Sequence, residues 1–212
     1  LSEADVKDLE FGCSQDVDFI AASFVRCAQD VLDVREVLKR CNKEEIMIIA
    51  KIENMQGIKN VEEILEVADG LMVARGDMGV EVDFDMLPAI QKDMISSCFR
   101  KGKIVVTATQ MLESMTKNPR PTRAEVSDVA NAVFDRTVAT MLSGESAAGL
   151  YPIQAVSAMS KINESAEKSI NYHKRFHRYR LDLGNSHLSS ICNAAVNASF
   201  QVDAKAIVCV TN

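Results

Sequence analysis

The sequence predicts an α/β fold built on a parallel sheet. Short apolar runs alternate with amphipathic stretches of helical period, and each run is followed directly by polar residues. The expected strands are residues 17–22, 46–51, 70–74, 104–106 and 140–142. Strictly alternating strands and helices give a parallel sheet, either open or closed into a (β/α)₈ barrel. Because five strands cannot close an eight-stranded barrel, a barrel would place three more strands before Leu1.

The helices expected between these strands follow from apolar stripes and capping residues. Ser2 is a predicted N-cap, with acidic residues in the first turn, and Gly12 is predicted to end that first helix near Phe11. Val31, Val34 and their neighbours form the stripe of the second helix. The expected helices are residues 3–11, 30–41, 57–67, 87–100, 124–134 and 151–170.

The C-terminal part of the sequence departs from this alternation. Residues 171–180 are basic and dotted with aromatic residues, which we interpret as a solvated linker. A helix at 186–201 and a strand at 204–210 are expected to open a second domain. The predicted division is therefore 1–170 and 171–212. The chain begins without Met and ends just after an apolar strand, so we expect it to be a segment of a longer protein.

Composition excludes several classes of function. The chain has 212 residues, of which 47% are apolar and 25% charged, and its net charge is -6. This acidic balance argues against binding to nucleic acid or to a membrane surface. No apolar run approaches the roughly 18 residues of a membrane span. The six cysteines include no C-x-x-C pair, so we expect reduced thiols in a cytoplasmic protein and no zinc site.

Candidate functional residues gather where the strands end. Lys51 and Glu53 follow one apolar run two residues apart, so they point to the same side. The pair alone has a plain structural explanation, in which the two charges satisfy each other. The other strand ends, however, also carry polar groups. They are Arg75, Gly76 and Asp77; Thr107 and Thr109; and Ser143 and Glu145.

These residue types suit chemistry on a small anionic substrate. Glu53 and Asp77, on successive strands, are fitted to share a divalent cation such as Mg²⁺, with substrate oxygens completing its shell. Lys51 beside them would stabilise negative charge developing on a phosphoryl group or an enolate. Gly76 permits close backbone approach, and Thr109 supplies a hydroxyl. The residues alone leave phosphoryl transfer and enolate chemistry both open.

Long runs of the sequence resemble the pyruvate kinase family. They occur in the family's order and cover essentially the whole chain. The runs are IIAKIENMQGI (48–58), VARGDMG (73–79), TATQMLESM (107–115), PRPTRAE (119–125), SDVANA (127–132) and MLSGE (141–145). The resemblance implies the last five strands of a (β/α)₈ barrel, followed by the first αβ unit of an α/β C-terminal domain.

The resemblance also implies an activity, the transfer of a phosphoryl group from phosphoenolpyruvate to ADP, giving pyruvate and ATP. Lys51 would stabilise the transferring group, and Glu53 and Asp77 would hold Mg²⁺ or Mn²⁺. The backbone at Gly76 and Asp77, together with Thr109, would bind the substrate carboxylate, with Thr109 near the carbon that is protonated. Four further residues are expected to contact these site residues without binding the substrate directly: Ser23, Arg75, Ser143 and Glu145.

The resemblance further implies a K⁺ ion whose ligands lie outside this chain, and a homotetramer. The family usually has Gly, Asp and Thr where this chain has Arg136, Val138 and Ser146. We expect the chain on its own to be inactive. Two alternatives remain at this stage: a metal-dependent lyase of the same barrel class acting through an enolate, and a pyruvate-kinase-like regulatory subunit without turnover.

Overall fold

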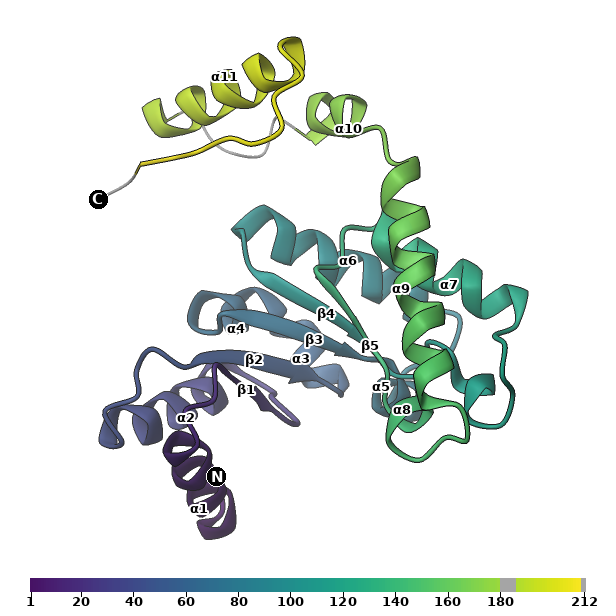
Figure 1. The fold of residues 1–212 in the computed structure, drawn as a ribbon. Helices are drawn as coiled ribbons and strands as arrows, with labels where there is room; N and C mark the ends of the chain where they lie inside the picture. Colours follow the sequence, from purple (N-terminus) through teal and green to yellow (C-terminus); the bar gives the residue numbers. More distant parts are fainter. Residues whose placement is uncertain (180–185, 211–212) are drawn as a thin grey trace. The chain divides into compact units, whose positions relative to one another are not determined.

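A computed structural model describes residues 1–179 and 186–210. The chain divides into two compact units, Leu1–Lys168 and Ser169–Asn212. The first unit contains a single five-stranded sheet (Figure 1). In the described residues, no helix is both long and apolar enough to cross a membrane.

All five strands of the sheet are parallel, and they lie in sequence order, β1-β2-β3-β4-β5. Their bounds are Phe19–Ala22 (β1), Met47–Ile52 (β2), Gly70–Ala74 (β3), Ile104–Ala108 (β4) and Ala139–Met141 (β5). The predicted α/β class with five parallel strands is therefore confirmed. In the register of the sheet Lys51 pairs with Met72, and Val73 with Thr107, so the strand ends that carry the candidate residues are neighbours.

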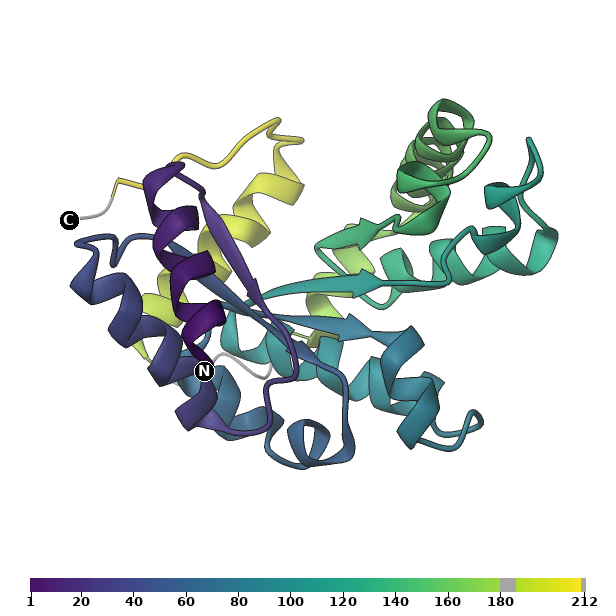
Figure 2. The same cartoon turned by 90° about the horizontal axis from the view of Figure 1, so that it is seen from below.

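Helices follow the strands as the sequence predicts, with additional short segments. They are α1 (Glu3–Ser14), α2 (Ala28–Arg40), α3 (Met55–Lys59), α4 (Val61–Val67), α5 (Arg75–Glu81), α6 (Leu87–Lys101), α7 (Arg123–Phe134), α8 (Gly144–Ala147) and α9 (Pro152–Ser169), with a 3₁₀ turn η1 (Glu113–Thr116). Figure 2 shows α1 and α2 beside β1, and α7 and α9 towards the β4–β5 side of the sheet.

Several helices differ from those predicted by more than a residue or two at their ends. Helix α1 continues through Gly12 to Ser14, because Gly12 does not adopt the left-handed conformation that ends a helix. The helix predicted at 57–67 is two helices, α3 and α4. Asn60 separates them, and its side chain donates a hydrogen bond to the carbonyl of Arg26 at 2.8 Å. Helices α5 and α8 were not predicted, because each has only one or two turns and no apolar stripe to reveal it.

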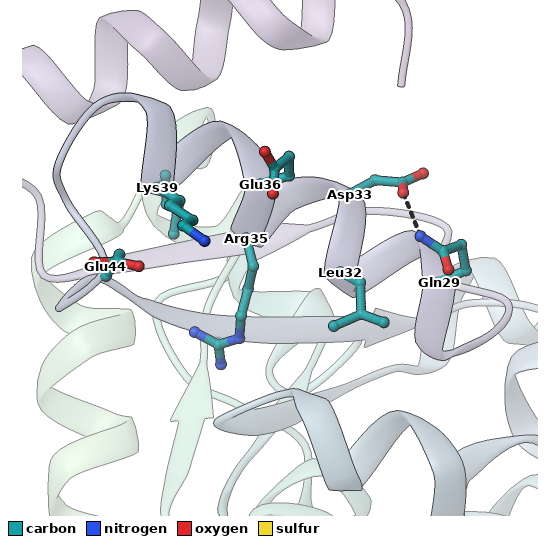
Figure 3. A pocket seen from close by; sticks show the side chains of 8 residues that line it. Gln29, Leu32, Asp33, Arg35, Glu36, Lys39 and Glu44 are labelled. Carbon is teal, nitrogen blue, oxygen red and sulfur yellow. Dashed lines mark hydrogen bonds between the residues drawn. The ribbon is translucent and has the colours of Figure 1, made fainter.

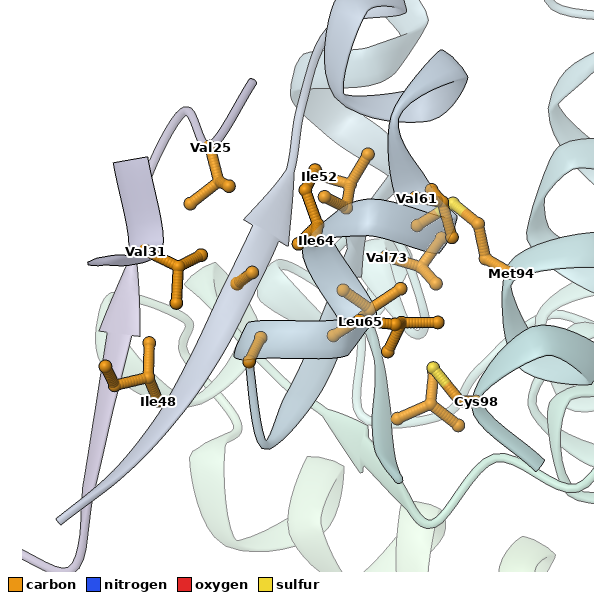
Figure 4. Close-up of a cluster of buried hydrophobic side chains, with 14 of the residues drawn as sticks. Val25, Val31, Ile48, Ile52, Val61, Ile64, Leu65, Val73, Met94 and Cys98 are labelled. Atoms are coloured by element: carbon orange, nitrogen blue, oxygen red, sulfur yellow. The ribbon is translucent and has the colours of Figure 1, made fainter. Parts of the chain in front are cut away.

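The main core lies between the sheet and helices α2, α4 and α6. Alternate residues of β2, including Ile48 and Ile52, are fully buried against Val31, Ile64 and other apolar side chains of those helices (Figure 4). Full burial of each such side chain stabilises the fold by about 1.5–3 kcal/mol. By the same alternation Lys51 points to the other side of the sheet. That side carries a smaller apolar cluster of Ile49, Met72 and Ala108.

A second core fixes the segment that follows β4. Met111, Leu112 and Met115 are fully buried against α7 and α9, where they contact Val129 and other apolar residues. Helix α7 begins with a capping box, because Thr122 accepts a hydrogen bond from the amide of Glu125 while the Glu125 carboxylate accepts one from the amide of Thr122. The loop after β4 is thus supported by packed helices.

The second unit corrects two predictions. Residues Tyr172–Tyr179 form a helix, α10, where a linker was expected, and Phe176 packs against Phe200 of α11 (His187–Gln201). The predicted strand at 204–210 is wrong, because these residues pair with no strand in the described part of the chain, and Val210 is 96% exposed. A strand needs a neighbour to satisfy its backbone. Arg180, the last residue of the predicted linker, lies outside the described residues.

Candidate active site

Lys51 and Glu53 meet at the C-terminal end of β2, as the sequence predicts. The Lys51 ammonium lies 2.8 Å from Glu53 Oε1 and donates a hydrogen bond to Ser23 Oγ at 3.0 Å. Ser23 follows the end of β1, so the contact joins the ends of two neighbouring strands. The Lys51 side chain keeps 23% of its surface exposed, which leaves its charge accessible to a ligand.

Glu53 is the more deeply buried partner. Only 1% of its side chain is exposed, and Oε2 accepts a hydrogen bond from the Phe24 amide at 2.5 Å. A buried carboxylate is costly unless it is paired and hydrogen-bonded. Lys51 and the Phe24 amide meet that need and fix the direction of the carboxylate. No local sequence pattern identified the Phe24 amide, because a backbone donor leaves no trace in residue type.

Gly76 and Thr109 are also brought together. The Gly76 amide donates to Thr109 Oγ1 at 2.7 Å, and that hydroxyl donates to the carbonyl of Ala108 at 2.6 Å. A Cβ added to Gly76 would lie 3.3 Å from Thr109 Oγ1, so any larger residue would crowd this contact. The end of β3 is thereby connected to the end of β4 through a backbone amide and a hydroxyl.

The backbone at this point adopts an uncommon conformation. Thr109 and Gln110 have φ angles of 68° and 53°, in the left-handed region. Such a conformation costs of order 1–3 kcal/mol for each residue that is not glycine, and it persists only where the surroundings impose it. Arg75 is the main local support, since its guanidinium donates to the carbonyls of both Thr109 and Gln110. It also donates to Gln91, to the Met111 sulfur and to Asp128 of α7; sequence reasoning missed Asp128 because the two residues are 53 positions apart.

Asp77 differs from the other candidate residues in being exposed. It lies in the first turn of α5, just past the end of β3, where a negative charge is favourable. No hydrogen bond or ion pair of the described residues involves its carboxylate. The described residues also contain no group of three or more His, Cys, Asp or Glu side chains placed to hold a metal ion. Any cation here would therefore need oxygen ligands from a substrate or water beside the carboxylates of Glu53 and Asp77.

Ser143 and Glu145 have a structural part to play. Glu145 is fully buried, and its two carboxylate oxygens accept hydrogen bonds from the amides of Leu112 and Ser143 at 3.0 and 2.8 Å. Glu145 thus ties the segment after β5 to the segment after β4. The buried Thr107 hydroxyl lies 2.9 Å from that of Thr137, so it does not take part in the Gly76–Thr109 contact.

The three positions that depart from the family pattern lie near β5. Arg136 has a φ of 81°, and its guanidinium lies over the ring of Phe99, 4.1 Å from the ring centre. Val138 is 65% exposed. Ser146 is exposed, and its hydroxyl donates to the carbonyl of Ser143 at 3.4 Å.

Cavities in the first unit do not all coincide with these residues. One, of about 430 Å³, lies along the outer side of α2 between side chains such as Gln29, Asp33 and Lys39, and it includes none of the candidate residues (Figure 3). A larger one, of about 760 Å³, runs along β1 and α1 and reaches Ser23 and Asn54. Only the second cavity touches the edge of the sheet where Lys51 lies.

Comparison with known proteins places the chain in a family. Residues 1–156 match the family described as pyruvate kinase, barrel domain. A protein named pyruvate kinase from Staphylococcus haemolyticus is 53% identical over 211 residues, which is 100% of this chain and 36% of the relative. The pyruvate kinase of Bacillus licheniformis is 50% identical over 98% of this chain and 36% of its own length.

A third relative is similar to the whole length of this chain. The pyruvate kinase of Clostridium perfringens is 50% identical over 100% of this chain and 45% of its own length. The chain thus spans 36% to 45% of the length of these three relatives. Its five parallel strands, with Lys51, Glu53, Gly76 and Thr109 gathered at their C-terminal ends, agree with the matched description. This chain therefore belongs to the pyruvate kinase family and corresponds to part of the family's barrel domain.

Proposed function

We propose that this chain supplies catalytic residues of a pyruvate kinase at the C-terminal ends of its strands. The enzyme transfers the phosphoryl group of phosphoenolpyruvate to ADP and yields pyruvate and ATP. The observation that carries the proposal is the Lys51 cluster. A partly exposed ammonium is held between Ser23 Oγ and the buried Glu53 carboxylate, at the C-terminal end of a parallel strand. Barrel enzymes of this class place their chemistry at that end.

Each residue has a role that fits its surroundings. Lys51 is fixed in advance, so it stabilises charge on the transferring phosphoryl group without reorganising during the reaction. Gly76 and Thr109 bring an amide and a hydroxyl together at adjacent strand ends, and both would turn from their present acceptors, Thr109 Oγ1 and the Ala108 carbonyl, to the carboxylate of the substrate. Thr109 then also lies beside the carbon that receives a proton when the enolate becomes pyruvate.

A divalent cation fits the donor set. Glu53 and Asp77 follow neighbouring strands and offer carboxylate oxygens, the ligands that Mg²⁺ and Mn²⁺ prefer, and Asp77 is exposed. Such a cation would neutralise negative charge on the substrate oxygens. Within the chain, Lys51 orients Glu53 and so keeps one of these carboxylates aimed in a fixed direction. K⁺ and nucleotide contacts would come from the remainder of the protein.

We also propose an architecture, a cellular compartment and an oligomeric state for the whole protein. Residues 1–170 would be the last five strands of a (β/α)₈ barrel with their helices, and residues 171–212 would begin a C-terminal domain. The whole protein would work in the cytoplasm, as a homotetramer. The chain by itself would be inactive, because it provides only part of the barrel and none of the proposed K⁺ contacts.

The test is pyruvate formation by the full-length protein that contains this chain, with Mg²⁺, K⁺, phosphoenolpyruvate and ADP. Lys51→Met should lower the rate by of order 10³-fold, the effect of removing a preorganised charge. Lys92→Met is the matched control, since Lys92 is also ion-paired, to Asp135, but lies on α6. A wild type that binds phosphoenolpyruvate without turnover would refute the proposal in favour of a regulatory subunit.

A further inference from the structure

Arg75 and Asp128 connect three elements at the proposed substrate edge. The geometry points to them as a positioning pair that sets the conformation of the Thr109–Gln110 loop, and through it the hydroxyl and amide that receive the substrate carboxylate. This inference deepens the proposed function and rests on it only for the identity of the substrate. Arg75 opens α5 directly after β3, the loop follows β4, and Asp128 lies on α7.

All three nitrogens of the Arg75 guanidinium donate hydrogen bonds. Its Nε and Nη2 donate to the Thr109 carbonyl at 3.1 and 2.7 Å, and Nη2 also donates to the Gln110 carbonyl at 3.0 Å. Its Nη1 donates to both Asp128 oxygens, at 2.9 and 2.7 Å. Only 13% of the Arg75 side chain is exposed. This arrangement needs the planar fork of arginine, because a lysine ammonium cannot reach both carbonyls and the carboxylate.

The loop held by Arg75 is one that would not keep its shape unaided. Thr109 is β-branched, and both Thr109 and Gln110 have positive φ. Charge-assisted donors on their two carbonyls favour this conformation over an ordinary extended one. Because the Thr109 hydroxyl accepts from the Gly76 amide, a shift of the Thr109 backbone would move that hydroxyl and release the amide.

Asp128 anchors the pair to a rigid part of the fold. Its neighbour Val129 is fully buried in the second core, and α7 is capped at Thr122. The Asp128 side chain is 38% exposed, so solvent weakens its charge attraction to Arg75 and the ion pair adds little to stability. Its main effect is to fix the direction of the guanidinium. Asp128 touches no proposed substrate group and acts only through Arg75, which makes it a positioning residue.

The experiment compares Asp128→Ala with Asp135→Ala in the full-length protein. Asp135 is the matched control, because it caps the end of the same helix and is paired with a lysine, Lys92. Asp128→Ala should lower kcat/KM for phosphoenolpyruvate by about 10- to 100-fold, as removal of a residue that orients a ligand group does. The KM for ADP should not change. Asp128→Glu should restore part of the loss, and Asp135→Ala should affect neither substrate.

A second measurement does not depend on activity. Amide hydrogen exchange at Gly76 should be faster by about tenfold or more in Asp128→Ala and in Arg75→Lys, because the Thr109 acceptor is no longer held in place. It should be unchanged in Asp135→Ala. Unchanged exchange in Asp128→Ala would overturn the inference. If the wild type has no turnover, the proposed function is refuted, while the exchange data still decide whether this pair positions the loop.

Discussion

Lys51 and Glu53 form an ion pair that is exposed on one side only, with 23% of the lysine side chain accessible but 1% of the glutamate. The two partners therefore depend on each other unequally. Lys51 without Glu53 could be solvated by water, whereas Glu53 without Lys51 would be a buried carboxylate that keeps only the Phe24 amide as a partner. The lysine proposed for catalysis is at the same time the charge that makes the buried glutamate tolerable.

This asymmetry predicts that Lys51→Met lowers stability as well as rate. Loss of the partner of a buried charge costs about 3 kcal/mol. Adding Glu53→Gln to Lys51→Met should recover a large part of that loss, because the neutral amide no longer needs a cation. Urea unfolding of the single and double variants measures the difference. Equal midpoints for the two variants would mean that Glu53 does not rely on Lys51.

Asp77 provides the opposite case, a carboxylate whose removal should cost little stability. It is exposed and has no ion-pair partner among the described residues, so Asp77→Asn should lose no more than the roughly 0.3–1 kcal/mol that a negative charge in the first turn of α5 contributes. The Mg²⁺ concentration needed for half-maximal rate should rise by about tenfold or more, since a proposed ligand has been lost. Asp85→Asn, an exposed neighbour beyond α5, should change neither quantity. An unaltered Mg²⁺ requirement in Asp77→Asn would contradict its role as a ligand.

Arg136 occupies a position whose backbone suits glycine. At a φ of 81° a residue with a side chain is disfavoured by about 1–2 kcal/mol, and a cation over an exposed aromatic ring returns about 0.5–1 kcal/mol. Arg136→Gly should therefore be neutral or stabilising by up to about 1.5 kcal/mol. Phe99→Leu should cost more in the wild type than in the Arg136→Gly background. A double-mutant cycle with no coupling energy would show that the ring contact contributes nothing.

The capping box of α7 predicts a pH dependence. Burial by itself would raise the pKa of Glu125, but hydrogen bonds from Ser114 and Thr122 outweigh it and hold that pKa below its ordinary value. A lowered folded-state pKa means that the stabilisation is complete above the unfolded-state pKa, near 4.3, and is lost as pH falls through the folded value. Glu125→Gln should thus make stability less dependent on pH below about pH 4.5. Parallel acid limbs in the two proteins would argue against this contribution.

The sequence was sufficient to predict the elements that hydrophobic periodicity along the chain reveals. Apolar runs placed all five strands, and period-2 alternation placed Lys51 and Glu53 on one side of β2. The bounds of the short helices α5 and α8 were not predicted, because one or two turns show too little periodicity to detect. The strand expected at 204–210 failed for a different reason: β-forming residues need a neighbouring strand, and composition does not say whether one exists.

In the candidate site, too, some features were predictable from the sequence and others were not. Residue type and position identified Lys51, Thr109 and their neighbours as polar groups at strand ends. The contacts that hold them were not predictable, since Arg75 and Asp128 are distant in sequence and the Phe24 amide is part of the backbone. Contacts of this kind arise from the three-dimensional packing of α7 against the loop after β4.

The order of the sheet has a consequence for handling the protein. Strands β1 and β5 are the outermost of the five, and in the described residues each is paired along one side only. An uncovered strand edge presents a row of backbone donors and acceptors that another chain is able to pair with. Phe19 of β1 is 47% exposed, which adds an apolar surface at one of these edges. Produced in isolation, these 212 residues carry two templates for aggregation, and their solubility depends on whatever covers them.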